Sequence, residues 1–225
     1  MSLHNKYIVL TGDLKASRKI KEREKIQENF KVALEKVNES FKEAIVARFI
    51  IIGGDSFQGM LSSPLPIFDI YYELFDNISY PFYLGIGIGS ISTKLSKNVG
   101  EMDGEAFYKA GEALEKVKKK GTWISFRSGW EIDAIVTASW NLMADVMWRW
   151  SERQKEIIMY YRRHGENRDA IEKATKNFGV TDKNIYKILR RGRYHLLKEV
   201  ESALNSLINQ KWLNKKIKPD TVEKR

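Results

Sequence analysis

The sequence contains no cysteine, which excludes disulfide bonds and thiolate metal sites and suits a reducing compartment. Histidine is nearly absent. There are three, and neither His164 nor His195 has a partner at the spacing of metal ligands. We therefore interpret both of these histidines as structural or exposed.

Long apolar runs are also missing. No segment approaches the roughly 20 apolar residues of a membrane span, and the first residues, MSLHNKYIVLTGD, lack an apolar run of signal-peptide length. Apolar residues still make up 43% of the chain, which is ample for a packed core. We expect a soluble, cytoplasmic protein that has no membrane partner.

Nearly all of the excess of basic over acidic residues lies in the last third of the chain. Residues 151–225 hold 19 Lys and Arg against 10 Asp and Glu, whereas residues 1–150 hold 20 against 19. A near-neutral part followed by a basic part indicates that only the second part meets a polyanion. The length of 225 residues allows one or two domains, and the charge division favours two with separate roles.

Apolar runs and helical stripes alternate over the first 126 residues. Strands are predicted where apolar runs stop at glycine or alternate with it, and helices where apolar residues recur every three or four positions. The predicted strands are 7–13, 44–52, 56–61, 82–93 and 122–126, and the predicted helices are 17–44, 63–78 and 103–120.

The resulting order, β-α-β-β-α-β-α-β, predicts an α+β fold of the ferredoxin-like kind. Its sheet contains antiparallel strands, with helices on one face. Within the fourth strand, three aliphatic residues alternate with three glycines over residues 84–89. A strand face stripped of side chains indicates that a helix or a ligand approaches it closely.

The pattern is helical from about residue 130 onward. We assign an α+β domain to residues 1–130, a connecting helix to 131–150, an all-α helix-turn-helix domain to 151–213 and a polar tail to 214–225.

Two aspartates, Asp13 and Asp55, each follow an apolar strand and a glycine. In a βαββ arrangement the first strand lies beside the hairpin, so its end and the hairpin corner can meet at one edge. Two carboxylates at close range repel each other unless they are protonated or bridged by a cation. Mg²⁺ is the natural bridge, because it uses one or two carboxylates and takes its other ligands from phosphates and water. The pair predicts a metal site that holds a nucleotide or another phosphate ligand.

Nearby residues are candidates for contact with the phosphates. The backbone of TGDLKASR, between the first strand and its helix, can form an anion-binding corner. Each aspartate could instead have a local role, Asp13 as a helix cap and Asp55 as a turn residue. The phosphate-binding candidates are Gly12, Lys15, Arg18, Gly53 and Gly54.

Several segments together resemble the SatD family of bacterial proteins. They are YIVLTGDLKASR, FIIIGGDSFQG, LGIGIGSIST, DGEAFYKAGEAL and WSERQKEII, in that order along nearly the whole chain. That family is similar to the nucleotide-cyclase superfamily, in which one aspartate ends the first strand and another lies on the hairpin. The resemblance implies a nucleotide-cyclase-like sheet domain and two metal-binding positions that match Asp13 and Asp55.

The match to the cyclases has departures that put catalysis in doubt. Ser56 stands where diguanylate cyclases have an essential acidic residue. Tyr108 and Glu112 stand where class III cyclases have an asparagine and an arginine that stabilise the transition state. A glutamate beside developing negative charge repels it, so the resemblance implies metal and phosphate binding more firmly than cyclisation.

The pattern of the basic part predicts three short helices. The first runs from Ser151 to about Arg163, the second from about Asn167 to Phe178, and the third from Thr181 to about Arg191. A glycine turn between two helices is typical of a helix-turn-helix, and the stretch resembles the C-terminal DNA-binding domain of sigma factors. A merely solvated basic face, or a protein contact, remains the alternative. The candidate DNA-binding residues on the third helix are Lys183, Asn184, Lys187, Arg190 and Arg191.

Beyond Arg193, apolar residues at helical spacing predict a last helix that packs on its own domain or on a second subunit, as in a homodimer that doubles its DNA contacts.

The leading hypothesis is a DNA-binding regulatory protein with a cyclase-like domain that binds a nucleotide or phosphate ligand through Mg²⁺. The alternatives are an active nucleotidyl cyclase, or other metal-dependent phosphoryl-transfer enzyme, with a helical regulatory arm, and an interaction module without chemistry.

Overall fold

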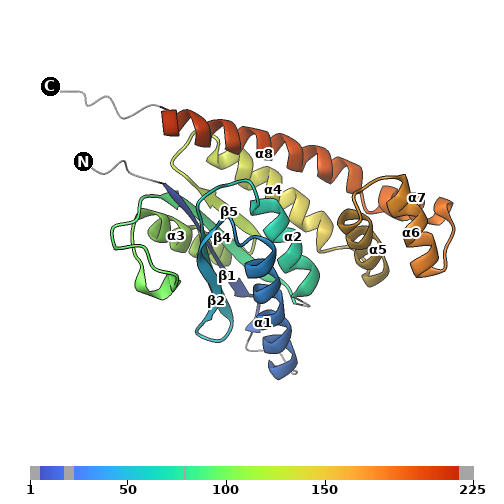
Figure 1. The fold of residues 1–225 in the computed structure, drawn as a ribbon, viewed down its shortest axis with the longest axis horizontal. Coiled ribbons are helices and arrows are strands. Elements are labelled where there is room, and N and C mark those ends of the chain that lie inside the picture. Colours follow the sequence, from blue (N-terminus) through green and yellow to red (C-terminus); the bar gives the residue numbers. More distant parts are fainter. Residues whose placement is uncertain (1–5, 18–22, 79, 218–225) are drawn as a thin grey trace. The chain divides into compact units, whose positions relative to one another are not determined.

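The predicted order of strands and helices is confirmed by the computed structural model, which describes residues 6–17, 23–78 and 80–217 (Figure 1). The first elements are β1 (Tyr7–Leu14), α1 (Arg23–Ser40), β2 (Ile45–Ile52), β3 (Ser56–Leu61), α2 (Ile67–Asn77), β4 (Phe82–Gly89), the short 3₁₀ helix η2 (Val99–Glu101), α3 (Glu105–Lys120) and β5 (Ile124–Arg127). They are followed by α4 (Asp133–Met147), α5 (Glu152–Arg163), α6 (Arg168–Phe178), α7 (Asp182–Arg191) and α8 (Tyr194–Ile217).

The chain forms two units. One comprises residues 1–141 and 204–225, and the other comprises residues 142–203. The last turns of α8 therefore belong with the sheet, whereas the sequence pattern had assigned all of residues 151–213 to one helical domain. No helix in the described ranges is both long and apolar enough to span a membrane.

The sheet has the strand order β2-β3-β1-β4-β5, so β1 lies at its centre. β1 pairs antiparallel with β3 on one side and with β4 on the other, and β5 joins β4 in parallel at the edge. The central position of β1 beside the β2–β3 hairpin is the arrangement that the sequence predicted. It places the end of β1 next to the hairpin corner.

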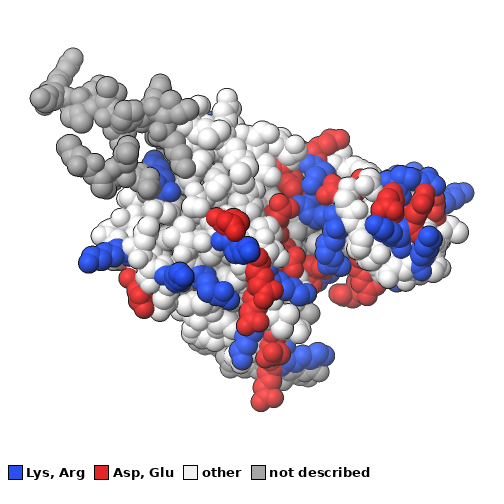
Figure 2. Space-filling view, in the orientation of Figure 1, with Lys and Arg blue, Asp and Glu red and all other residues white. Residues whose placement is uncertain are grey.

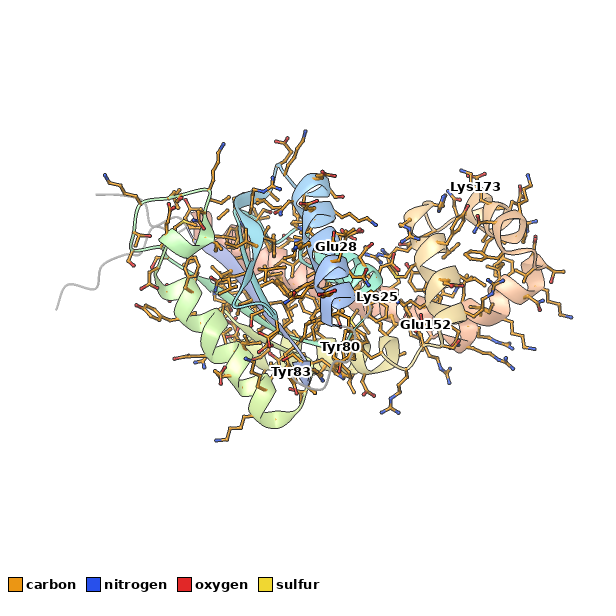
Figure 3. All side chains as sticks on the ribbon, turned by 90° about the horizontal axis from the view of Figure 1, so that it is seen from below. Lys25, Glu28, Tyr80, Tyr83, Glu152 and Lys173 are labelled. Atoms are coloured by element: carbon orange, nitrogen blue, oxygen red, sulfur yellow. The ribbon has the colours of Figure 1, made fainter. Side chains whose placement is uncertain are left out.

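Helices cover both faces of this sheet, so the prediction that they share one face is wrong. On one face, Phe82 of β4 packs against Phe57 of β3 and Tyr71 of α2, and Phe57 packs in turn against Phe30 of α1. The opposite face of β4 receives α3. Figure 3 shows α3 and α1 on opposite sides of the strands.

The glycines of β4 explain why α3 can lie on that second face. A Cβ atom on Gly85 would meet the backbone carbonyl oxygen of Ala110 at 2.4 Å, and one on Gly87 would meet that of Ala106 at 2.2 Å. The helix backbone therefore occupies the space that side chains on this face of β4 would need. The close approach that the glycine pattern predicted is made by a helix.

An aromatic core fills the other face. Trp140 of α4 stacks on Phe68 of α2, with ring centroids 4.0 Å apart, and both rings are fully buried.

Side chains of α4 also form hydrogen bonds with the outer edge of β5. The Asn141 amide oxygen accepts from the Ile124 N–H at 3.0 Å, and the Thr137 hydroxyl accepts from the Phe126 N–H at 3.0 Å. An otherwise open strand edge is thereby satisfied.

The second unit is built on three short helices whose predicted limits are confirmed. Ser151 caps α5 in a reciprocal bond with Gln154, Asn167 caps α6, Gly179 ends α6 with φ +62°, and Thr181 caps α7. The helices share one buried core, formed by Ile157, Ile158, Tyr161, Ala170, Ile171, Ala174, Ile185, Leu189 and Tyr194.

The start of α8 is tied to α5 by a buried ion pair. The Arg162 guanidinium donates two bonds of 2.9 Å to the Glu201 carboxylate, and both side chains are less than one tenth exposed. Further along α8, Leu204, Ile208 and Trp212 are buried in the structure. These three residues belong to the sheet unit, so the prediction that the last helix packs along its length on its own helical domain is wrong.

The glycine face of β4 leads to a first prediction. Gly87→Ala should destabilise the protein by about 1–3 kcal/mol, because the new methyl group must displace the α3 backbone. Gly111→Ala, within α3, should instead stabilise by about 0.5–1 kcal/mol, because a Cβ there meets nothing within 4 Å. Urea unfolding followed by circular dichroism measures both changes. Effects of the same sign would contradict this account of the packing.

Candidate functional site

Asp13 and Asp55 lie at the same end of the sheet. Asp13 is in register with Ser56 of β3 and Tyr83 of β4. Asp55 precedes β3 in the hairpin corner, and its backbone carbonyl accepts a hydrogen bond of 2.9 Å from the Leu14 N–H. The fold therefore brings together two acids that are distant in sequence.

A third charged group, Lys118 of α3, lies beside the two aspartates. Its ammonium forms an ion pair with the Asp13 carboxylate, and these side chains are only 33% and 14% exposed, respectively. Burial disfavours the ammonium and tends to lower the pKa of Lys118. The hydrogen bond and charge of Asp13, with the charges of Glu115 and Asp55, outweigh it and raise the pKa of Lys118. A side-chain cation is therefore already present where the two acids converge.

The Asp55 corner is held by contacts to the loop after β1 and to α1. The Ser17 hydroxyl donates to an Asp55 carboxylate oxygen at 2.6 Å, and the Gln27 side chain donates to the Gly54 carbonyl at 3.2 Å. Gly53 and Gly54 have φ of +66° and +91°, a conformation that favours glycine. A Cβ on Gly53 would meet nothing within 4 Å, so the backbone at this residue is open to an approaching group.

The other phosphate-binding candidates have varied surroundings. The Lys15 ammonium lies over the rings of Trp123 and Tyr83, at 3.3 and 4.5 Å from their centroids (Figure 3 labels Tyr83). Gly12 leaves room for the Phe57 ring, which a Cβ would meet at 2.2 Å. Packing alone therefore accounts for Gly12. Arg18 lies outside the described residues.

The donor set can be tested against a metal ion. In the described part of the chain, no group of three or more His, Cys, Asp or Glu side chains is placed to hold one. Two carboxylates suffice for Mg²⁺ only when phosphates and water complete its coordination. Asp13 and Asp55 thus fit a metal that arrives with a phosphate ligand, and Lys118 must then share Asp13 with it or release it.

The two positions on α3 that depart from the cyclase pattern have local partners. The Tyr108 hydroxyl donates to the Asp103 carboxylate at 2.7 Å, and this contact raises the pKa of Tyr108. The Glu112 carboxylate pairs with the Arg127 guanidinium at 2.8 Å. The negative charge of Glu112, which the sequence had marked as an obstacle to catalysis, is therefore partly neutralised.

In α7 the buried residues are Ile185 and Leu189. All five candidate DNA-binding side chains are exposed, and within the described residues none of the four cations forms an ion pair. By contrast, Arg168 and Lys173 of α6 pair with Asp182 and Asp169. Figure 2 shows acidic and basic side chains interspersed on this unit. The candidates are Lys183, Asn184, Lys187, Arg190 and Arg191.

Sequence reasoning missed two members of the site, Lys118 and Ser17. Lys118 follows Val117, the last buried residue of α3, so it lies at the border of the face that packs on the sheet. The glycine pattern of β4 predicted a closely packed helix, and this border position was the available signal. Ser17 belongs to the TGDLKASR segment, in which the backbone and the side chains of Lys15 and Arg18 were predicted to contact phosphates but the Ser17 hydroxyl was not.

Two solved structures align with part of the chain. The catalytic core of a rhodopsin-guanylyl cyclase with converted specificity, in complex with ATPalphaS, aligns with a TM-score of 0.38 and 10% identity over 50% of this chain and 72% of that chain. The guanylate cyclase domain of RhGC from Catenaria anguillulae, in complex with GTP, aligns with a TM-score of 0.37 and 10% identity over 50% and 73%.

No curated protein matches the sequence. The SatD family profile matches residues 7–159, which is more than half of the chain and includes β1, the hairpin, α3 and the start of the helical unit. The match confirms the family resemblance inferred from the sequence motifs. The chain belongs to the SatD family.

Proposed function

We propose that the sheet unit binds a nucleotide or similar phosphate ligand together with Mg²⁺. The observation that carries this proposal is the convergence of Asp13, Asp55 and the Lys118 ammonium at one end of the sheet. Such a cluster offers oxygen donors to a divalent ion and positive charge to a phosphate. It lies beside the open backbone of Gly53.

Asp13 and Asp55 would hold the Mg²⁺ ion, which supplies charge neutralisation for the phosphates when bound. Lys118 would neutralise further phosphate charge once the metal competes for Asp13. Ser17 keeps the Asp55 carboxylate in position through its short hydrogen bond. Gly53 and Gly54 let the backbone approach the ligand without obstruction by side chains.

For the helical unit, we propose that α7 binds double-stranded DNA, which makes the protein a cytoplasmic DNA-binding regulator. The support is the set of exposed, unpaired cations on the side of α7 opposite Ile185 and Leu189, together with the basic balance of residues 151–225. Lysine and arginine bind phosphates, and Asn184 is able to hydrogen-bond to base edges.

The alternative function is catalysis of nucleotidyl cyclisation or another metal-dependent phosphoryl transfer. It is favoured by the Arg127–Glu112 ion pair, which lessens the repulsion that Glu112 would exert on developing negative charge. Incubation with ATP or GTP and Mg²⁺ distinguishes the two: a cyclase forms a cyclic product and pyrophosphate, another phosphoryl-transfer enzyme leaves a nucleoside diphosphate, and a binding protein leaves the nucleotide unchanged.

The nucleotide site is tested by calorimetric titration with ATP and GTP, with and without Mg²⁺. We expect binding that depends on Mg²⁺ and that weakens at least about tenfold, equivalent to ~1.4 kcal/mol, in Asp13→Asn and in Asp55→Asn. Each variant removes one negative ligand of the ion and keeps the size of the side chain.

Asp145→Asn is the matched control, because that carboxylate pairs with Arg149 in an exposed i,i+4 contact on the protein surface. It should bind like the unaltered protein. Equal affinity in all three variants, or binding that does not depend on Mg²⁺, would contradict the metal site.

The DNA proposal is tested by replacing Lys187, Arg190 and Arg191 together with alanine. Duplex affinity should fall, and the slope of log affinity against log salt should become shallower by up to about 3, since each lost phosphate contact removes roughly 0.9. Fluorescence anisotropy over a salt series measures both quantities.

A variant with the same change in net charge provides the control. Lys31, Lys42 and Lys94 are exposed residues of the sheet unit, and their replacement by alanine should leave the salt slope unaltered. Equal losses in the two triple variants would show that only net charge matters, and α7 would then have no specific role.

A further inference from the structure

A groove at the outer edge of the sheet forms a second candidate site, separate from Asp13 and Asp55. It lies between α3, β5 and α4 and encloses about 510 Å³. Small-molecule sites typically enclose roughly 300–1,000 Å³. The groove is therefore large enough for a small organic ligand.

The groove does not serve as a docking place for an added β-strand, because the backbone groups along the edge of β5 already have partners. Asn141 of α4 accepts from the N–H groups of Trp123 and Ile124 and donates to the Ile124 carbonyl at 2.6 Å. Thr137 bonds in the same way to the N–H of Phe126. Because these side chains already satisfy the edge, a peptide strand has little to bind there.

One polar group in the groove lacks a partner. Ser125 of β5 is only 1% exposed, and its hydroxyl oxygen has no hydrogen-bond partner in the part of the chain that the structure describes. Buried hydroxyl groups are nearly always hydrogen-bonded, because an unmade bond is costly. Ser125 lines the groove, so an oxygen atom of a ligand there would supply the missing partner.

The positive charge of the groove comes from the last turns of α3. Lys116 and Lys120 both line it, as residues four apart on one helix face should. Lys118, between them, lies on the other side of α3 and pairs with Asp13. Lys116 and Lys120 are exposed and form no ion pair with any residue that the structure describes.

Two further charged residues line the groove, and both have partners. Arg127 pairs with Glu112 at 2.8 Å. The Asp133 carboxylate accepts from the backbone N–H groups of Ser128 and Gly129 at 2.9–3.1 Å, so its charge is compensated at the start of α4. The unpaired charge in the groove is therefore that of the two lysines.

Five apolar residues also line the groove, beside Thr122, Thr137 and Asn141: Val117, Ile124, Phe126, Ala134 and Ala138. Cations at the rim, an unsatisfied hydroxyl within and apolar side chains beside them match a ligand that has an anionic end and an apolar body. We propose that this groove binds a small organic phosphate, with the phosphate near Lys116 and Lys120 and the apolar portion against α4.

The test is a titration of ¹⁵N-labelled full-length protein with phenyl phosphate, monitored by NMR. We expect saturable shifts at Ser125, Thr137 and the Asn141 side-chain amide. Inorganic phosphate should bind more weakly, because it lacks an apolar portion. The double variant Lys116→Gln/Lys120→Gln should weaken phenyl phosphate binding at least about tenfold, since it removes two charge-assisted contacts. Ser125→Ala should weaken binding as well.

Lys119→Gln is the matched control, because Lys119 is an exposed lysine of the same helical turn that does not line the groove. It should leave the affinity unchanged. Asp13→Asn should also leave it unchanged, so failure of the proposed nucleotide site does not affect this test. Absence of saturable shifts at the three groove residues, equal affinity for inorganic phosphate, or equal losses in Lys119→Gln and the double variant would overturn the proposal.

Discussion

The direct contact of the α3 backbone with β4 is the constraint on which the candidate site depends. Gly85 and Gly87 place no side chains on that face of β4, so the backbone of α3 packs directly on the strand. This contact fixes the height and rotation of α3 and thereby places Lys118 next to Asp13. Bulkier residues in β4 would separate the helix from the strand and, with it, the ammonium from the carboxylate.

Charge balance at the end of β1 follows from that packing. Asp13 and Asp55 both lie at this end of the sheet, and the Lys118 ammonium pairs with Asp13 and is stabilised by the charge of Asp55. A divalent ion that binds together with a phosphate can replace the Lys118 ammonium beside Asp13. The ammonium can then pair with the phosphate, so no carboxylate is left unpaired. The proposed binding of a metal together with a phosphate rests on this exchange.

Much of this arrangement could be predicted from the sequence, because local signals determined it. The glycine corner at Gly53 and the apolar strands around it predicted the hairpin, and sequential pairing then placed Asp55 beside the end of β1. The three short helices were predicted to within one or two residues, and in the structure Ser151, Asn167 and Thr181 cap them. These features depend on neighbours in the chain, which a sequence pattern records directly.

Features that depend on distant parts of the chain could not be predicted in this way. The glycine face of β4 predicted a closely packed partner. It did not predict that α3 would cover a second face of the sheet, because the spacing of apolar residues does not show on which face a connecting helix lies. The Lys15 contact requires Trp123, which becomes a neighbour only when β5 joins β4. The assignment of the end of α8 to the sheet unit likewise depends on tertiary contacts.

The central claim is that the acids at the end of β1 bind a divalent ion together with a phosphate ligand. Paramagnetic broadening by Mn²⁺ in the presence of a nucleotide tests it most directly, because the effect falls steeply with distance from the ion. The account predicts selective loss of the backbone amide signals of Asp13, Gly54 and Asp55. Broadening centred elsewhere, or none at these residues, would contradict it.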